Sequence, residues 1–328
     1  MRTTTVPRLG RDISLVGLGT WQLGGDWATV GDEAAQEVLA AAADAGTRLF
    51  DTADVYGDGR SERAIGRFLA ERGDRDEFTV ITKMGRRAEP HVPEAYTLDN
   101  FRRWTDRSRE LLGVETLDLV QLHCPPTPVY SDERVFDDLR VLVDEGRIAR
   151  FGVSVELVDE ALAALEQPDL ATIQIIVNIF RRKPLERVLP LAAERGVGII
   201  ARLPLASGLL SGKYDEHTTF APEDHRTWNR DGRLMNIGET FSGIPFEVGV
   251  AAAREVAALT PAGWATSQLA LGWLAQMGVA TMIPGASKPS QARANAEAAE
   301  FPELAPEALA RLEEIYEEYC REHVHDVF

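Results

Sequence analysis

The sequence has few cysteines, no long apolar run and a shortage of positive charge, and each of these absences excludes a class of protein. Cys124 and Cys320 are the 2 cysteines among 328 residues. Two are too few for a disulfide framework, so we expect free thiols in a reducing compartment. The segment from Met1 to Gly19 has no apolar core of the signal-peptide type, and no apolar run reaches membrane-spanning length. These absences predict a soluble cytoplasmic protein.

Positive charge is scarce, since 35 Lys and Arg residues face 52 Asp and Glu residues and give a net charge of -17 at pH 7. Nucleic acid and anionic membranes are therefore disfavoured as partners, because both are negatively charged. Apolar residues make up 45% of the chain, which is enough for a large core. The length suggests about two domains, but parallel barrels often exceed that size as one domain.

Short apolar strands alternate with helical patterns along the whole chain. Asp32 is the expected cap of a helical pattern that ends at Gly46 and leads into the next strand. Further helices are expected over 98–112 and 132–145. The eight predicted strands lie near residue 17 and at 49–51, 78–83, 117–123, 148–153, 172–177, 198–202 and 280–283. This alternation predicts an α/β protein with a (β/α)8 TIM barrel, formed as a single domain by residues 1–328.

Four segments are predicted outside this alternation. Thr3 to Ser14 has the pattern of a β-hairpin that covers one end of the barrel. Loop 85–96 follows the third strand, and a polar and aromatic insertion, 214–246, precedes the last one. Long loops at the carboxyl end of a barrel usually shape the substrate pocket. A final helix over 306–321 is expected to pack over the barrel.

Individual residues of these segments carry narrower expectations. His225, Trp228 and Phe241 in the insertion predict a packed lid, with substrate contact from at least one of them as an alternative. His323 and His325 in the tail are expected to be solvated. We expect no metal site there, because no further histidines or cysteines converge on them.

Polar residues stand at or just after the ends of three consecutive predicted strands. Asp51 and Tyr56 follow the second strand, Lys83 closes the third and His123 closes the fourth. Because the carboxyl ends of parallel strands meet on one face, these side chains should lie close together. Buried Lys83 would stabilise the phenolate that remains when Tyr56 gives up its proton, and Asp51 would supply the counter-charge. Ser61 is the expected N-cap of the helix that follows this loop.

Each of these residues also has a structural interpretation. Asp51 could cap a turn, Tyr56 could be a packing residue, and Lys83 could extend to solvent. His123 could be a core histidine. Their coincidence at three successive strand ends favours catalysis. A metal-dependent hydrolase that uses Asp51, Asp54 and His123 is a remote alternative, because the sequence offers only one strand-end histidine and barrel metal sites usually need more.

At these positions the sequence resembles the aldo-keto reductase family, and the resemblance covers nearly the whole chain. It rests on several motifs, which are Gly17-Leu18-Gly19-Thr20-Trp21, Asp51 to Gly57 with Ser61-Glu62, Thr82-Lys83, Gln121-Leu122-His123, Gly152-Val153-Ser154, Pro204-Leu205 with Gly208 to Lys213, and Ile283 to Ser287. The resemblance implies that Asp51, Tyr56, Lys83 and His123 form a catalytic tetrad. In this family the tyrosine donates a proton while a nicotinamide delivers hydride to an aldehyde or ketone.

The resemblance also implies NADPH as the cofactor. Ser154 and Gln174 would hold the carboxamide, and a turn near 207–213 would hold the pyrophosphate. The helix that begins near Ser287 would hold the adenosine end, with its amides facing an anion. The full set of implied cofactor contacts is Gly19, Thr20, Asp51, Ser154, Gln174, Arg202, Pro204, Leu205, Ser207, Leu210, Lys213, Ser287, Lys288, Gln291 and Asn295.

A positive patch is needed to attract a phosphorylated cofactor to an acidic protein. Arg202, Lys213, Lys288 and Arg293 are predicted to supply it. Lys288 and Arg293 favour NADP over NAD.

Three residues depart from the family's pattern around the expected nicotinamide site. Val155 stands where asparagine usually follows, Val177 replaces a frequent tyrosine, and Arg202 stands where many members stack an aromatic ring on the nicotinamide. A guanidinium plane can also stack or bond there.

The substrate pocket is predicted to include Trp21, Tyr56 and His123, with a core position as the less favoured alternative for Trp21. The expected ligand is a small carbonyl compound, and the expected assembly is a monomer or weak homo-oligomer. A regulatory subunit that binds NADPH with little turnover is the alternative function, and the intact tetrad argues against it.

Overall fold

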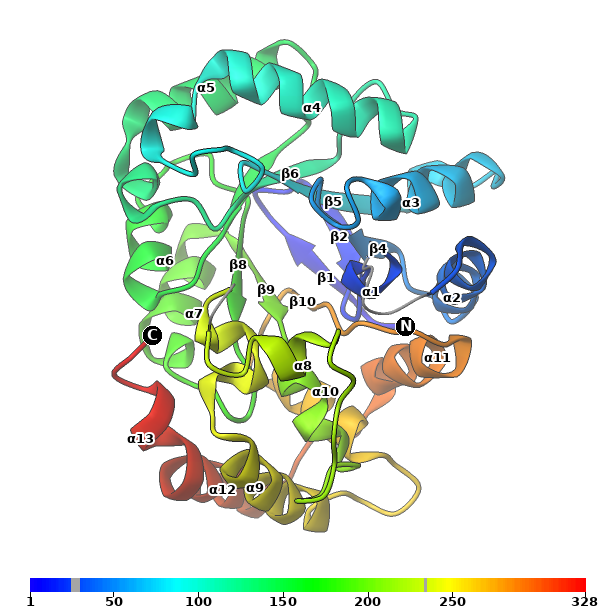
Figure 1. Ribbon diagram of the computed structural model, residues 1–328, viewed down its shortest axis with the longest axis vertical. Coiled ribbons are helices and arrows are strands. Elements are labelled where there is room, and N and C mark those ends of the chain that lie inside the picture. Colours follow the sequence, from blue (N-terminus) through cyan, green and yellow to red (C-terminus); the bar gives the residue numbers. More distant parts are fainter. Residues whose placement is uncertain (25–29, 233–234) are drawn as a thin grey trace.

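Eight parallel strands form the centre of the structure, a computed structural model that describes residues 1–24, 30–232 and 235–328 (Figure 1). Hydrogen bonds join the strands in the order β10-β9-β8-β7-β6-β5-β4-β3. Parallel bridges from Val16 to Met282 and from Gly19 to Gly285 bring the first and last strands together. The strands are β3 (Leu18–Gly19), β4 (Leu49–Asp51), β5 (Thr79–Met84), β6 (Leu119–His123), β7 (Phe151–Ser154), β8 (Thr172–Ile176), β9 (Gly198–Arg202) and β10 (Thr281–Met282). The sheet thus closes into the predicted (β/α)8 barrel.

Helices surround this sheet on its outer side, as Figure 1 shows. Most are amphipathic and bury one face against the strands, as in α4, where Phe101, Thr105 and Leu112 are buried. The longer helices are α2 (Asp32–Asp44), α3 (Arg60–Ala70), α4 (Leu98–Leu112), α5 (Glu133–Asp144), α6 (Val158–Leu165), α7 (Pro184–Arg195), α9 (Phe246–Ala258), α10 (Thr266–Gln276), α11 (Pro289–Glu297) and α12 (Pro306–Ile315). Among the described residues, none of the helices is both long and apolar enough to cross a membrane.

Short helical turns occupy many of the connections. Three are brief α-helices, α1 (Trp21–Gly24), α8 (His225–Trp228) and α13 (Arg321–Val324). The 3-10 turns are η1 (Arg75–Glu77), η2 (Pro93–Ala95), η3 (Thr127–Ser131), η4 (Ala206–Ser211), η5 (Ile237–Glu239), η6 (Phe241–Gly243) and η7 (Ala298–Glu300), and η8 (Tyr316–Cys320) is a π turn. Several of these turns lie at the carboxyl end of the barrel and carry residues of the site described below.

An antiparallel hairpin covers the amino end of the barrel, as predicted. It consists of β1 (Thr3–Val6) and β2 (Arg11–Ser14), paired from Thr3 opposite Ser14 to Val6 opposite Arg11. Its buried side chains join the first inward-facing residues of the barrel strands in one apolar cluster. The cluster contains Val6, Leu9, Ile13, Leu49, Ile81, Leu119, Ala171, Ile200, Ala280 and Ile283.

Along several strands, the inward-facing side chains change from apolar in this cluster to polar at the carboxyl end. Side chains two residues apart point to the same face of a strand. Leu49 in β4 is therefore followed inward by Asp51, and Ile81 in β5 is followed by Lys83. In β9 the same step leads from Ile200 to Arg202. The barrel interior is thus apolar at its amino end and charged at its carboxyl end.

The structure corrects two predicted helix caps. Helix α3 begins at Arg60, and its N-cap is Gly59 with φ +83°. Ser61 lies inside the helix, where its hydroxyl group contacts the hydroxyl groups of Thr20 and Thr52. Asp32 is likewise the first residue of α2, after the N-cap Gly31. In both helices the N-cap is a glycine. The preference of serine and aspartate for N-cap positions had pointed to a nearby residue instead.

The carboxyl-terminal part differs from the prediction in three ways. The predicted helix 306–321 is divided into α12, the π turn η8 and α13. His325 is buried rather than solvated, because its Nδ1 lies 2.8 Å from the hydroxyl group of Tyr316. The gap before β10 holds two long helices, α9 and α10, which follow the predicted insertion 214–246. Residues 233–234 of that insertion lie outside the described residues.

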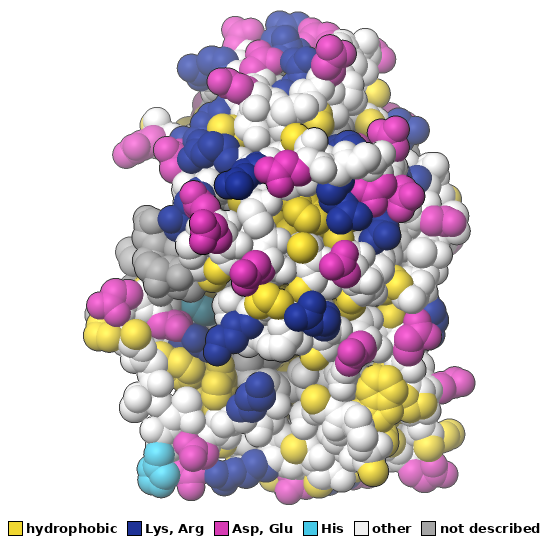
Figure 2. Space-filling view, turned by 90° about the vertical axis from the view of Figure 1, so that its right-hand side faces the viewer, with side chains coloured by type: hydrophobic (Ala, Val, Ile, Leu, Met, Phe, Trp, Pro, Cys, Tyr) yellow, Lys and Arg dark blue, Asp and Glu magenta, His cyan; other side chains and the backbone are white. Residues whose placement is uncertain are grey.

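The surface in Figure 2 carries acidic and basic side chains interspersed with one another. Many of them are ion-paired at short range, as in the Arg72–Asp74 and Arg140–Asp169 pairs. Both cysteines are free thiols, as predicted.

Candidate active site

The four predicted catalytic residues come together at the carboxyl end of the barrel. The Nζ atom of Lys83 lies 2.6 Å from Oδ1 of Asp51 and 5.1 Å from the ring centroid of Tyr56. The rings of Tyr56 and His123 meet edge to face, with centroids 5.9 Å apart. Strand register explains the convergence, because β4, β5 and β6 are adjacent and end on the same face. The spacing at three strand ends thus correctly predicted one cluster.

Close backbone contact fixes the position of Tyr56. Gly57 has φ +59°, and a Cβ atom at this position would lie 1.9 Å from the carbonyl oxygen of Gly24. A Cβ atom on Gly24 would in turn lie 2.5 Å from the backbone of Tyr56. Only glycine tolerates both the left-handed conformation and this approach. The short helix α1 therefore packs directly on the loop that presents the phenol.

Lys83 and Asp51 form a buried ion pair with further hydrogen bonds on both sides. Lys83 also donates to the carbonyl of Thr52, at 2.8 Å, and Gln174 donates to Oδ2 of Asp51, at 2.7 Å. Burial lowers the pKa of Lys83, but the charges of Asp51 and Tyr56 outweigh it and raise that pKa overall. Burial raises the pKa of Asp51, and Lys83 opposes that shift. With a contact of 2.6 Å, we regard the pair as charged.

The two rings of the cluster have shifted pKa values in opposite directions. Burial raises the pKa of Tyr56, and the charge of Lys83 opposes this increase. Burial, together with the charges of Arg86, Lys83 and Arg202, lowers the pKa of His123 well below its usual value. His123 is therefore a neutral imidazole at pH 7, and its buried Nδ1 has no hydrogen-bond partner within the described part of the chain. A neutral imidazole can donate one hydrogen bond to a carbonyl oxygen.

Two buried carboxyl groups lie behind the tetrad. Asp54 follows the tetrad's Asp51 by three residues and is fully buried, and neither of its carboxylate oxygens has a hydrogen-bond partner among the described residues. Burial, followed by the charge of Glu62, raises the pKa of Asp54 to about 8. Glu62 accepts a hydrogen bond from Thr82 at 2.6 Å. The structure thus keeps Asp54 largely protonated at neutral pH.

The predicted carboxamide contacts lie beside the tetrad. Ser154 at the end of β7 is paired in register with His123 on one side and with Gln174 on the other. Thr20 is buried, and its hydroxyl group donates to the carbonyl of Asp51 at 2.8 Å. Gly19 donates its amide to the carbonyl of Pro284 at 3.1 Å, which closes the barrel. Thr20 and Gly19 therefore have structural roles here, and their contact with a cofactor remains a prediction.

The predicted phosphate contacts lie in two places, the turn η4 and the start of α11. Both elements contact α10. In η4, which follows Pro204 and Leu205, Ser207 has φ +54° and accepts a hydrogen bond from the amide of Phe241 at 3.0 Å. Exposed Lys213 follows this turn, after buried Leu210. Before α11, the amide of Ser287 donates to the side chain of Gln291 at 2.9 Å. The remaining predicted contacts there are exposed Lys288 and buried Asn295, whose side chain donates to the carbonyl of Gly285 at 3.3 Å.

Arg202 is not available as a free cation for a phosphate group, which corrects one member of the predicted positive patch. Its guanidinium group lies 3.0 Å from Oε2 of Glu156 and 3.3 Å from Oε1 of Glu239, and it also donates to the carbonyl of Val155 at 3.0 Å. The Arg202 side chain is only 9% exposed. Two carboxylates therefore balance its charge at the barrel mouth.

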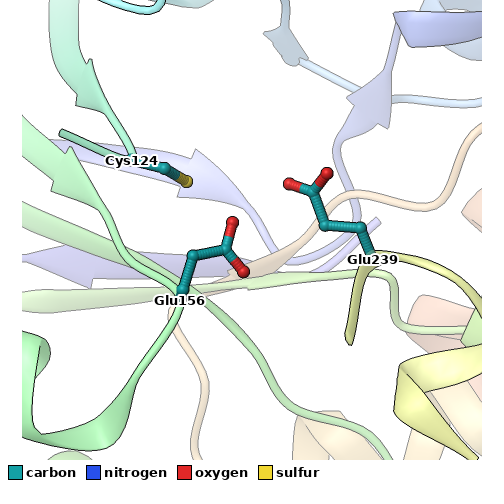
Figure 3. A group of neighbouring side chains, drawn as sticks. All are labelled: Cys124, Glu156 and Glu239. Carbon is teal, nitrogen blue, oxygen red and sulfur yellow. The ribbon is translucent and has the colours of Figure 1, made fainter. Parts of the chain in front are cut away.

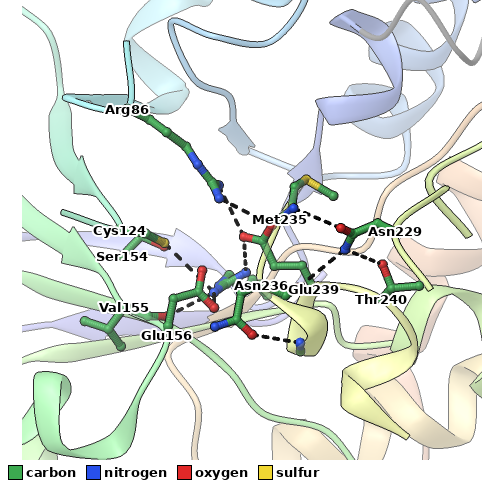
Figure 4. Close-up of polar contacts among 12 residues, drawn as sticks. Arg86, Cys124, Ser154, Val155, Glu156, Asn229, Met235, Asn236, Glu239 and Thr240 are labelled. Atoms are coloured by element: carbon green, nitrogen blue, oxygen red, sulfur yellow. Dashed lines mark hydrogen bonds and ion pairs between the residues drawn. The ribbon is translucent and has the colours of Figure 1, made fainter. Parts of the chain in front are cut away.

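Arg86 extends this arrangement into a network that the sequence did not reveal (Figure 4). Its guanidinium group donates to both oxygens of Glu239, at 3.2 and 3.5 Å. We call Arg86, Glu156, Arg202 and Glu239 the charged network. Arg86, Glu156 and Arg202 follow or close barrel strands, a signal similar to the one that revealed the tetrad. Glu239 lies in η5, and no spacing rule points to it.

Cys124, Glu156 and Glu239 are close enough for their ligand atoms to lie within 4.8 Å of one another (Figure 3). Such a set could hold a cation in another setting. Here Arg202 pairs with both carboxylates, and Arg86 pairs with that of Glu239. Burial, followed by the charge of Glu156, also raises the pKa of Cys124 to about 12, so its thiol keeps its proton. The guanidinium groups are therefore the counterions of these carboxylates.

The insertion reaches back over the barrel mouth. The rings of Trp21 and His225 meet edge to face, with centroids 4.7 Å apart. Phe241 is buried and belongs to an aromatic cluster with Tyr214, Phe220 and Phe246. The insertion is thus a packed lid, as predicted, and its His225 contacts Trp21, the first residue of α1.

Comparison with known proteins gives a consistent result. The chain matches the sequence model of the Aldo/keto reductase family over residues 15–317. It is 31% identical to the aldo-keto reductase YhdN of Bacillus subtilis over 90% of this chain and 88% of that protein. The glycerol dehydrogenase AKR11B4 of Gluconobacter oxydans superposes with a TM-score of 0.77 at 28% identity, covering 99% of this chain and 97% of that one. An aldo-keto reductase of Klebsiella pneumoniae, solved in complex with NADPH, has the same fold, with a TM-score of 0.72 at 23% identity and 96% coverage of both chains.

Proposed function

Because this chain belongs to the aldo/keto reductase family, we propose that it reduces an aldehyde or ketone to the corresponding alcohol with NADPH. The single observation that carries the proposal is the buried Lys83–Asp51 ion pair beside the ring of Tyr56. Two buried charges and a buried phenol are expensive to hold in a protein interior. Their arrangement around one point is what proton donation to a carbonyl oxygen requires.

The residues around the tetrad fit a nicotinamide dinucleotide. Ser154 and Gln174 are paired in adjacent strands, and Gln174 contacts Asp51, so both can face a carboxamide beside the tetrad. Lys213 follows the turn η4, and Lys288 directly precedes α11, whose N-terminal end suits an anion. When bound, NADPH supplies the hydride that reaches the carbonyl carbon. The phosphate on its ribose, matched by Lys288 and Arg293, is our reason for preferring NADPH over NADH.

The side chains of the tetrad would then handle the proton. Tyr56 donates its phenolic proton to the carbonyl oxygen as that oxygen becomes negative, and the alcohol forms. Lys83 stabilises the phenolate left on Tyr56, and Asp51 keeps Lys83 charged and in place. Neutral His123 donates a hydrogen bond to the same oxygen and so orients the substrate between the two rings. Trp21 forms a wall of the pocket.

Tyr56→Phe tests this proposal. The substitution removes the phenolic proton and leaves the ring, so we expect the rate of NADPH oxidation to fall by about 10²- to 10⁴-fold. Wild type and variant should be measured side by side on aromatic aldehydes, aliphatic aldehydes and diketones. Binding of NADPH should be preserved in both, as checked by fluorescence titration.

Two other outcomes would count against the proposal. An unchanged rate in the variant would exclude Tyr56 as the proton donor. Binding of NADPH by both proteins without turnover of any carbonyl compound would instead favour a regulatory subunit that senses the cofactor, and a co-purifying protein partner would strengthen that alternative. A cytoplasmic location and a monomeric or weakly associated state stay predictions.

A further inference from the structure

The charged network lies at the same end of the barrel as the reacting groups of the proposed function, and its Arg202 lies 4.0 Å from the sulfur of Cys124, the residue after His123. Arg86 follows Lys83 by three residues, and Glu156 follows Ser154 by two. Arg86 and Arg202 both act on the pKa of His123, and Arg86 and Glu239 act on that of Tyr56. These charges are therefore within electrostatic range of a carbonyl compound bound between Tyr56 and His123.

Glu239 occupies a position between two guanidinium groups that suits the carboxylate of a ligand. Its Oε1 lies 3.2 Å from Arg86 and 3.3 Å from Arg202, and its side chain is 9% exposed. Arg202 has a second carboxylate partner, Glu156. No second carboxylate lies within ion-pair distance of Arg86 in the described ranges, and its side chain is 29% exposed. The Arg86 side chain is thus partly exposed, and Glu239 balances its charge.

The turn that carries Glu239 is held firmly in place. Asn229 is fully buried, accepts a hydrogen bond from the amide of Met235 at 2.9 Å and donates to the hydroxyl group of Thr240 at 3.0 Å. Asn236 caps the turn by accepting from the amide of Gly238 at 2.8 Å. The lid therefore brings its carboxylate to the two arginines in a defined geometry.

The same turn is supported from the opposite side by the end of the chain. Phe328 packs against Gly238 and Gly243, where a Cβ atom would lie 2.9 and 2.8 Å from its ring. The guanidinium group of Arg181 stacks on that ring at 3.7 Å from the centroid and donates to the carbonyl of Glu156 at 2.9 Å. Both carboxylates of the charged network are thus anchored through their backbones.

The charges around the site balance one another. Arg86 and Arg202 oppose Glu156 and Glu239, and Lys83 opposes Asp51. An anionic substrate would meet no uncompensated positive charge here and would approach a protein of net charge -17. An uncharged carbonyl compound escapes both penalties.

We propose that Glu239 is a specificity-determining residue whose carboxylate fills the place of an anionic substrate group, so that the enzyme accepts uncharged carbonyl compounds and rejects those carrying a carboxylate. The inference rests on the proposed reductase function and names its substrate class. Glutamine at position 239 would keep the size of the side chain and a carbonyl acceptor for Arg86, but it would leave that guanidinium group without a counter-charge. A carboxylate on the substrate could then take up the vacated role.

The test compares 3- and 4-formylbenzoate with their methyl esters, which differ from the acids in charge and keep the aromatic aldehyde. We expect the wild type to reduce the esters with the higher kcat/KM. In Glu239→Gln, the acid-to-ester ratio of kcat/KM should rise by about tenfold or more for at least one isomer, mainly through a lower KM for the acid. Glu216→Gln is the matched control, because Glu216 lies in the same insertion and pairs with Arg254 at the surface.

Arg86→Met provides an independent second variant. It leaves Glu239 with one arginine, so the acid-to-ester ratio should fall below that of the wild type. In the double variant with Glu239→Gln, it should abolish the rise in the acid-to-ester ratio of kcat/KM. Calorimetric titration of the NADP+-loaded proteins with benzoate and benzamide adds a measurement without turnover, and only Glu239→Gln should bind benzoate more tightly than the wild type does.

Each outcome separates the specificity inference from the proposed function. An unchanged ratio in Glu239→Gln with intact ester turnover, or an equal gain in Glu216→Gln, would overturn the role of Glu239 and leave the reductase function standing. If the wild type and Glu216→Gln reduce none of the aldehydes, the substrate assignment fails with the proposed function. Benzoate binding then decides whether Glu239 still excludes carboxylates from this site.

Discussion

The two ends of the barrel are formed by the same strands but enclose opposite kinds of side chain. At the amino end, Leu49, Ile81 and Leu119 pack with the hairpin in an apolar cluster. Two or four residues further along the same strands, Asp51, Lys83 and His123 form a buried polar cluster. Burial of apolar surface stabilises the fold, whereas burial of charge opposes it unless every charge is paired. The comparison indicates that stability resides at one end and chemistry at the other.

Among the changes that test this comparison of the two ends, breaking the ion pair at the carboxyl end should have the largest effect. Lys83→Met should lower kcat by about 10²- to 10³-fold, because the phenolate of Tyr56 loses its neighbouring charge. It should also lower the free energy of unfolding by about 3–5 kcal/mol, since Asp51 stays buried without its partner. Steady-state kinetics and urea denaturation measure the two effects.

The double variant Asp51→Asn with Lys83→Met separates chemistry from stability at this end. Removing both charges should restore most of the lost stability and none of the activity. A double variant as unstable as Lys83→Met alone would contradict the view that these charges are retained for chemistry.

The converse effect is expected at the amino end. Leu119 is fully buried in the apolar cluster, so Leu119→Ala should lower the free energy of unfolding by about 2–5 kcal/mol. Below the unfolding transition, kcat/KM should stay close to the wild-type value, because the polar end of β6 is unchanged. Denaturation and kinetics on the same preparation check both statements.

Val327→Ala is the control for this substitution, because its side chain lies on the surface with the residue 58% exposed. It should change stability by no more than about 0.5 kcal/mol. A loss of kcat/KM in Leu119→Ala as large as its loss of stability would show that the two ends do not act separately.

A smaller effect should appear in the pH dependence of stability, through Asp54 behind the tetrad. Burial raises its pKa in the folded protein to about 8, well above the usual value for an aspartate. The folded state therefore holds a proton that the unfolded chain has lost, and stability falls as pH rises toward 8. Between about pH 6 and pH 7.5, the free energy of unfolding of the wild type should fall by about 2 kcal/mol more than that of Asp54→Asn. Denaturation at each pH measures this difference.

Asp58→Asn serves as the control for Asp54. Asp58 is exposed and pairs with Arg87 and Arg107 at 2.8 Å, contacts that lower its pKa. Its loss should not flatten the decrease between pH 6 and pH 7.5. Equal slopes in wild type and Asp54→Asn would show that Asp54 is ionised in the folded protein.

Much of the fold and of the tetrad could be predicted because both depend on patterns with a fixed period. Apolar strands at regular intervals predicted the barrel, and α4 begins and ends where the helical pattern indicated. Polar residues at strand ends predicted that Asp51, Tyr56, Lys83 and His123 would meet. Helix caps were less predictable, since glycines at positions 31 and 59 took the place expected for Asp32 and Ser61.

The charged network shows where such patterns stop being informative. The sequence showed that Arg202 departs from the family's pattern at a strand end. It did not show which carboxylates pair with Arg202. Glu239 lies far along the chain in a lid whose course no periodicity constrains, and His325 is buried in the tail, where its ring meets the hydroxyl group of Tyr316. Neither contact follows from a repeating pattern in the sequence.

The sequence by itself determined the barrel, the polar strand ends and the family, because alternation places side chains on one face regardless of what covers it. Only the tertiary structure decided the charge state of the site. Whether Arg202 attracts a phosphate or balances two carboxylates depends on Glu239, which arrives from the lid. Electrostatic energy depends on the distance between charges in space and on their burial, and neither quantity is encoded locally in the chain.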